Sequence, residues 1–156
     1  MEEFRIPKRE AHVQVLLDDG RVLDGEIFAT FRGRDGRPGR VLDRLNEIDQ
    51  EFIAMQSGEE RFLLNKSGIV TVEVPGTVAD VLDQEPDAGR TVTVRLSLAG
   101  GTGLVGRLHL IMPPERSRVL DYFNTAPRFF PLIAEGRITL VQKRFVMSAR
   151  DLAGGE

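Results

Sequence analysis

Few residues of this chain have the chemistry of a catalyst. The 156 residues contain no cysteine and only two histidines, His12 and His109, which excludes thiol catalysis, disulfide scaffolds and cysteine-based metal sites. Both histidines alternate with apolar residues and are interpreted as structural, and no serine lies in a nucleophile elbow. The acidic residues are scattered over turns, where Asp-Gly is turn chemistry. We therefore predict a protein that is not an enzyme and that uses no cofactor and no metal.

Basic residues offer a second kind of chemistry, the binding of phosphate. Segment 32–39 is rich in glycine and arginine; arginine forks suit phosphate, and glycines permit close approach. The competing interpretation is a solvated surface loop, and the segment lacks the strand–GxxxxGK[ST]–helix context of a P-loop. The candidates for binding RNA or a nucleotide are Arg32, Arg34, Arg37, Lys66, Lys143 and Arg144.

A seven-residue motif, Arg-Val-Leu-Asp-x-(Leu/Phe)-Asn, occurs twice, 78 residues apart. In the structural interpretation, Val41, Leu42, Leu45 and Ile48 form one apolar stripe of a helical turn that closes an open barrel end. The Arg and Asp then pair on the solvent side, and the Asn ends the turn in a left-handed conformation. In the functional interpretation the polar positions bind a partner or ligand. These candidates are Arg40, Asp43, Asn46, Arg118, Asp121 and Asn124.

The motif belongs to a longer internal repeat. Phe52 aligns with Phe130 at an offset of 78, the Leu63–Lys66 segment with Leu140–Lys143 at 77, Val13 with Val92 at 79, and Gly25 with Gly106 at 81. Landmarks that keep one order while their offsets drift indicate two copies with small loop changes. We place the copies at 11–74 and 91–152, with residues 75–90 as a linker that contains a short helix capped by Thr77.

Each copy consists of short runs in which every second residue is apolar, and turns separate these runs. This pattern is typical of β-strands. Gly25 marks a bend or a bulge in the second run. Five strands are enough for a small curved barrel, and closure removes exposed edges. The predicted strands are 13–17, 22–28, 51–56, 61–64 and 69–74 in the first copy, and 92–98, 104–111, 129–133, 138–141 and 145–149 in the second.

The first copy resembles the Sm and Sm-like proteins. Residues 13–27 are similar to the first Sm motif, and residues 52–56 with 62–72 to the last three strands of bacterial Sm-like RNA chaperones. The resemblance implies two tandem five-stranded Sm-like barrels. The arginine-rich segment and the Val-Leu-Asp-x-Leu-Asn segment are not part of the usual Sm core, and the repeated motif adds a short helical turn before the third strand of each copy. The repeated motif also resembles a bacterial protein family of unassigned function.

The resemblance also implies an RNA site at a lysine–histidine pair entering the last strand. Lys66 and Lys143 match the lysine, whereas Ser67 and Arg144 stand where the histidine would be. The same family commonly associates by pairing open strand edges. A protein partner or a homo-oligomer is therefore the first expectation, and RNA is the alternative.

Charge is distributed unequally between the copies. The whole chain has a net charge of −3, but residues 11–74 carry about −4 and residues 91–152 about +5. Opposite charges attract the copies to each other, or one molecule to the next. The first residues are acidic and contain no apolar core, so we do not expect them to act as a signal peptide. No apolar run approaches membrane-spanning length. We therefore expect a cytoplasmic protein that makes no contact with a membrane.

Overall fold

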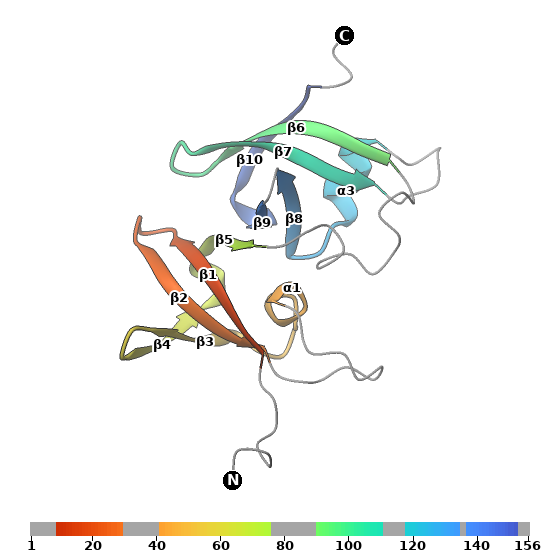
Figure 1. The fold of residues 1–156 in the computed structure, drawn as a ribbon. Helices are drawn as coiled ribbons and strands as arrows, with labels where there is room; N and C mark the ends of the chain where they lie inside the picture. The colour runs from red at the N-terminus through yellow and green to blue at the C-terminus, as the bar shows by residue number, and fades with distance from the viewer. Residues whose placement is uncertain (1–8, 30–40, 76–89, 111–117, 135–136, 153–156) are drawn as a thin grey trace.

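In the part of the chain that the structure describes, ten strands form one antiparallel sheet, and two short helices accompany it (Figure 1). The computed structural model describes residues 9–29, 41–75, 90–110, 118–134 and 137–152. The strand order is β10-β6-β7-β8-β9-β5-β1-β2-β3-β4. Strands β1 to β5 and β6 to β10 form two halves that meet at β5 and β9 (Figure 1).

The strands are β1 Arg9–Leu17, β2 Val22–Ala29, β3 Phe52–Ser57, β4 Glu60–Asn65, β5 Ile69–Pro75, β6 Arg90–Leu98, β7 Gly103–Leu110, β8 Phe129–Ala134, β9 Arg137–Gln142 and β10 Val146–Asp151. The helices α1 Val41–Leu45 and α3 Val119–Thr125 precede β3 and β8. The 3-10 turns η2 Lys66–Gly68 and η4 Lys143–Phe145 precede β5 and β10.

The prediction of a mainly β fold is confirmed, with a strand at each of the ten predicted places. The prediction of two separate barrels is not confirmed, because the ten strands belong to one open sheet. Strands β4 and β10 stand at its two ends, each with one hydrogen-bonded neighbour among the described strands. The predicted linker helix, the arginine-rich segment and Arg40 lie outside the described residues.

The two halves repeat each other in strand register. Val13 lies opposite Gly25 and Val94 lies opposite Gly106, so the offset is 81 throughout the first two strands of each half. The sequence alignment of Val13 with Val92 was therefore wrong by two residues. A two-residue shift keeps the same alternation of apolar side chains, which is why the pattern alone did not reveal it.

The last three strands repeat at an offset of 77. Phe52 lies opposite Asn65 and Phe129 lies opposite Gln142, so Phe52 corresponds to Phe129. The sequence alignment of Phe52 with Phe130 was wrong by one residue, because two adjacent phenylalanines offered two choices. The bulge between the first and fifth strands also recurs at corresponding positions of the two halves.

Glycine allows the second strand of each half to turn onto the third. A Cβ atom on Gly25 would lie 2.2 Å from the carbonyl oxygen of Gln56, and one on Gly106 would lie 2.7 Å from Cγ of Leu132. Neither glycine has a positive φ. Close approach of atoms of the third strand, not backbone conformation, therefore requires glycine at these two positions.

The core consists of two apolar clusters that exchange residues between the halves. Phe129, Ile138 and Leu140 come from the second half but pack in the cluster of the first. Val70 comes from the first half and packs in the cluster of the second, with Leu16 against it. The halves therefore share their hydrophobic cores as well as a strand pair.

The helices differ in how deeply they pack. In α1, Val41, Leu42 and Leu45 are buried, as the apolar stripe predicted. The prediction that Ile48 continues this stripe was wrong, since α1 ends at Leu45 and Ile48 is 92% exposed. Helix α3 has no buried residue of its own.

An aromatic cluster links α3 to the core of the second half. The rings of Tyr122, Phe123 and Phe130 contact one another edge to face, with centroids 5.3–6.0 Å apart, an arrangement that aromatic pairs favour.

Among the described residues, no helix is long and apolar enough to cross a membrane.

Replacing Gly25 by Ala is expected to destabilise the fold by about 1–3 kcal/mol, because the new methyl group collides with a backbone oxygen that cannot move alone. Urea unfolding followed by circular dichroism measures the change. Gly103→Ala is the matched control, because its Cβ would meet its nearest neighbour at an ordinary 3.8 Å. Equal stability of the two variants would contradict the close approach of Gly25 to the backbone of Gln56.

Tyr122, the single tyrosine of the chain, is expected to resist ionisation in the folded protein. Burial raises the pKa of its phenol, whereas in the unfolded chain the phenol ionises near pH 10. The folded state then holds the proton more tightly, so stability falls as the pH rises above about 10. Phenolate absorbance in buffer and in concentrated urea tests this; identical titration curves would contradict it.

Candidate interaction surface

The joint between the halves is an antiparallel pairing of β5 with β9. It runs from Thr71 opposite Val141 to Pro75 opposite Arg137. The strand order places the fifth strand of one half beside the fourth strand of the other. The interface between the halves is thus made by strand addition, in which backbone hydrogen bonds join the units and alternate side chains fill the cores on either side.

Asn46, the last residue of the first motif, fastens this joint. Its Nδ2 donates to the carbonyl oxygen of Phe129 at 3.0 Å, and its Oδ1 accepts from the backbone N–H of Phe129 at 2.8 Å. The predicted left-handed conformation is wrong, because no described non-glycine residue has a positive φ. The side chain of Asn46 mimics a strand neighbour at the start of β8.

A polar cluster lies at the same end of the joint, next to Phe129, which pairs with Gln142. Nη2 of Arg128 contacts Oε2 of Glu51 at 3.2 Å and Oγ of Ser67 at 3.0 Å. Arg128 Nε also donates to the buried Gln142, whose Nε2 donates to the carbonyl oxygens of Lys66 and Ile69. The hydrogen bond from Ser67 and then the contact with Arg128 lower the pKa of Glu51.

Sequence reasoning missed this cluster because its members lie far apart in the chain. The one available signal was the amide that precedes each repeated lysine, Asn65 in the first copy and Gln142 in the second.

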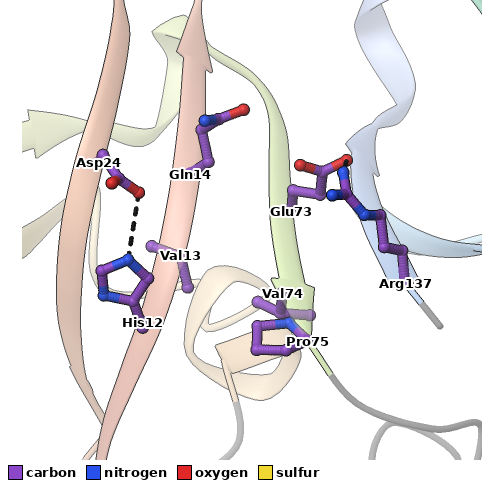
Figure 2. Close-up of a pocket in the computed structure, with 8 residues that line it drawn as sticks. All are labelled: His12, Val13, Gln14, Asp24, Glu73, Val74, Pro75 and Arg137. Carbon is purple, nitrogen blue, oxygen red and sulfur yellow. Dashed lines mark hydrogen bonds and ion pairs between the residues drawn. The ribbon is translucent and has the colours of Figure 1, made fainter.

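A surface pocket of about 340 Å³ lies beside the joint (Figure 2). Glu73 from β5 and Arg137 from β9 form an ion pair across the joint, with Oε2 and Nη1 2.8 Å apart. On the other side, His12 Nε2 and Asp24 Oδ1 are 3.2 Å apart, and both side chains are 64% exposed. Within the described part of the chain, no group of His, Cys, Asp and Glu residues is arranged to hold a metal ion.

Lys66 lies inside the first half and anchors α1. Its side chain is fully buried, and its Nζ donates to the carbonyl oxygens of Arg44, Leu45 and Glu47 at 3.2, 3.2 and 2.8 Å. A cation at the C-terminal end of a helix satisfies carbonyls that have no partner within the helix. Burial, and then the nearby Arg128, lower the pKa of Lys66. Its three ammonium donors point at protein carbonyls and leave none for phosphate.

The corresponding lysine of the second half has the same role with fewer contacts. Lys143 Nζ donates to the carbonyl oxygen of Ala126, just after α3, and the side chain is partly exposed. Arg144 is exposed, donates to the carbonyl oxygen of Ser67 at 3.1 Å and lies over the ring of Phe145. Of the nucleic-acid candidates that the structure describes, Arg144 is thus the one with an exposed side chain.

The second motif copy keeps the predicted ion pair. Arg118 Nε lies 3.0 Å from Oδ2 of Asp121, and this contact raises the pKa of Arg118. Asp43 and Asn124 both have exposed side chains. The structure therefore brings Asn46 to the joint, whereas its counterpart Asn124 on α3 is exposed.

Two apolar residues, Phe52 on β3 and Leu63 on β4, are exposed in the first half, whereas their counterparts in the second half are buried. Phe52 and Leu63 are 50% and 71% exposed. They correspond to Phe129 and Leu140, both fully buried in the core of the other half. A hollow of about 270 Å³ beside β4 includes Phe52 and Leu63 in its lining.

The second half shows the same relation. Leu120 on α3 and Met147 on β10 are 60% and 61% exposed. They correspond to Leu42 and Val70, which are 9% and 3% exposed because they pack in the shared cores. The strands at the two ends of the sheet, β4 and β10, are thus the counterparts of the two joint strands, β9 and β5. Each end strand has one side that pairs with no other described strand.

Replacing Lys66 by Met is expected to cost about 3 kcal/mol, because the apolar stem remains while the carbonyls at the end of α1 lose their donor. Lys143→Met, which removes a single carbonyl contact from a partly exposed side chain, should cost about 1 kcal/mol. Thermal and urea unfolding of both variants give the comparison. Equal losses, or a larger loss for Lys143→Met, would contradict the anchoring role of Lys66.

Comparisons with known proteins leave the resemblance to Sm-like proteins as a prediction. No family model matches the sequence, and no curated protein or solved structure matches the chain. The function is therefore argued from the contacts of the chain itself.

Proposed function

We propose that this chain is a non-catalytic interaction protein that associates with further copies of itself, head to tail, by pairing β4 of one molecule with β10 of the next. The observation that carries the proposal is the match between the two sheet ends and the internal joint. Four apolar residues of the two halves are at least half exposed, whereas their counterparts are buried in the shared cores. The exposed residues are Phe52, Leu63, Leu120 and Met147.

Edge strands support the same proposal. An edge strand presents unpaired backbone donors and acceptors and readily takes another strand. Strand β10 is the counterpart of β5, and β4 is the counterpart of β9, so their pairing repeats a contact that this chain already makes once. Exposed apolar side chains on both edges add a gain from burial.

The motif residue Asn124 would then have a defined role. Asn46 binds the backbone of Phe129 at the joint, and at offsets of 78 and 77 the corresponding pair is Asn124 and Phe52. In the proposed contact, Asn124 of one molecule binds the backbone of Phe52 in the next. The motif acts as a clamp in the joint and as a recognition element at the end.

The contact is heterologous, because two different surfaces meet. Such a contact closes into a ring when successive rotations return to the first molecule, and otherwise continues as a filament. Either product satisfies the proposal, since both bury the β4 and β10 edges.

Leu63→Lys is expected to weaken self-association by at least tenfold, because it places a charge where an apolar side chain would be buried. Light scattering coupled to gel filtration, over a range of protein concentrations, measures the mass of wild type and variant. The wild type should exceed the 17.4 kDa of one chain.

Val105→Lys is the matched control, since Val105 is 50% exposed on β7, an internal strand of the sheet. It should leave the mass unchanged. A wild type that stays at the mass of one chain at the highest concentration would refute the proposed function.

A further inference from the structure

The ion pair of the internal joint has a charge-reversed counterpart at the sheet ends. Glu73 on β5 pairs with Arg137 on β9 at 2.8 Å. At the offset of 77, Arg150 on β10 corresponds to Glu73, and Glu60 on β4 corresponds to Arg137. In a β4–β10 contact with the register of the joint, Arg150 and Glu60 would occupy the same two positions with their signs exchanged.

The surroundings of Arg150 favour an external carboxylate. Arg150 lies directly opposite Arg95 in the β6–β10 ladder, and like charges directly opposite each other destabilise a strand pair. Both side chains are exposed. In the joint, by contrast, Glu73 lies opposite the neutral Gln14. A carboxylate beside Arg150 would relieve a repulsion that the joint does not have.

The neighbouring positions of the two edges are complementary as well. The apolar pair Val74 and Ile138 of the joint is replaced at the ends by Asp151 and Arg61. Both of these residues make further interactions within the chain. The contact between molecules is therefore inferred from Glu60 and Arg150 alone.

We propose that Glu60 of one molecule and Arg150 of the next form an ion pair that sets the register and polarity of the head-to-tail contact and restricts the partner to a second copy of this chain. This inference rests on the proposed function. It adds the residues that determine specificity.

The reversal of charge also disfavours the replacement of a joint strand by a strand of another molecule. If β4 of another molecule replaced β9 beside β5, Glu60 would face Glu73. If β9 of another molecule paired with β10, Arg137 would face Arg150. Repulsion against the wrong partner is a common source of specificity. Charges on an edge can also serve only to prevent pairing, and that role predicts no benefit from restoring opposite signs.

The test uses complementary charge variants of the full chain. Glu60→Arg and Arg150→Glu, each alone, place like charges across the contact and should weaken association about tenfold. An equimolar mixture should recover the wild-type mass, because every contact between the two variants again joins opposite charges. The double variant, with both changes in one chain, should recover it as well. Light scattering and sedimentation velocity measure all four samples at low salt.

Controls separate this inference from the proposed function. Glu59→Arg makes the same charge change in the turn between β3 and β4, outside the paired strands, and should leave association at the wild-type level. Circular dichroism verifies that each variant folds. If both single variants associate like the wild type while Leu63→Lys does not, the ion pair is refuted and self-association stands. If the single variants weaken association but neither the mixture nor the double variant recovers it, the pair is likewise refuted. A monomeric wild type refutes both proposals.

Discussion

The pairing of β5 with β9 is the contact on which the rest of the structure depends. It converts two five-strand units into one sheet, and it brings Phe129, Ile138 and Leu140 of the second half into the core of the first. Neither half buries its own apolar surface completely without the other. The joint also leaves unlike strands, β4 and β10, at the two ends of the sheet. A sheet built in this way carries at its ends the same kinds of surface that meet at its centre.

The two repeated lysines illustrate how burial changes the meaning of a basic residue. Their positions after an apolar strand resemble an RNA-binding pattern, yet Lys66 is fully buried and binds three carbonyl oxygens near the end of α1. A charge in such a place is tolerated because each donor has a partner. The lysine stabilises the helix that directly precedes Asn46, and Asn46 in turn binds the backbone of Phe129. A residue expected to contact a ligand thus supports the joint from inside.

Local patterns in the sequence predicted the strands well, because alternation of apolar residues such as Val13, Val15 and Leu17 reports a strand that buries one face. They predicted the place of both helical motifs, but not where α1 ends, since Ile48 continues the apolar spacing beyond the last helical residue. They could not predict the β5–β9 joint, which pairs residues 62 to 70 positions apart in the chain through backbone groups. The contacts of Gln142 and Arg128 depend on that joint and were therefore hidden with it.

The two motif copies differ in a way that fits a permanent joint and a reversible end. Helix α1 buries Val41, Leu42 and Leu45 and is anchored by three contacts of Lys66. Helix α3 buries no residue completely, and Lys143 contacts one carbonyl. Asn46 consequently follows directly after a well-anchored helix, whereas Asn124 lies in a more exposed one. A clamp that must bind and release another molecule needs less support than one that holds two parts of a single chain. The unequal anchoring of the two helices therefore fits the proposed assembly.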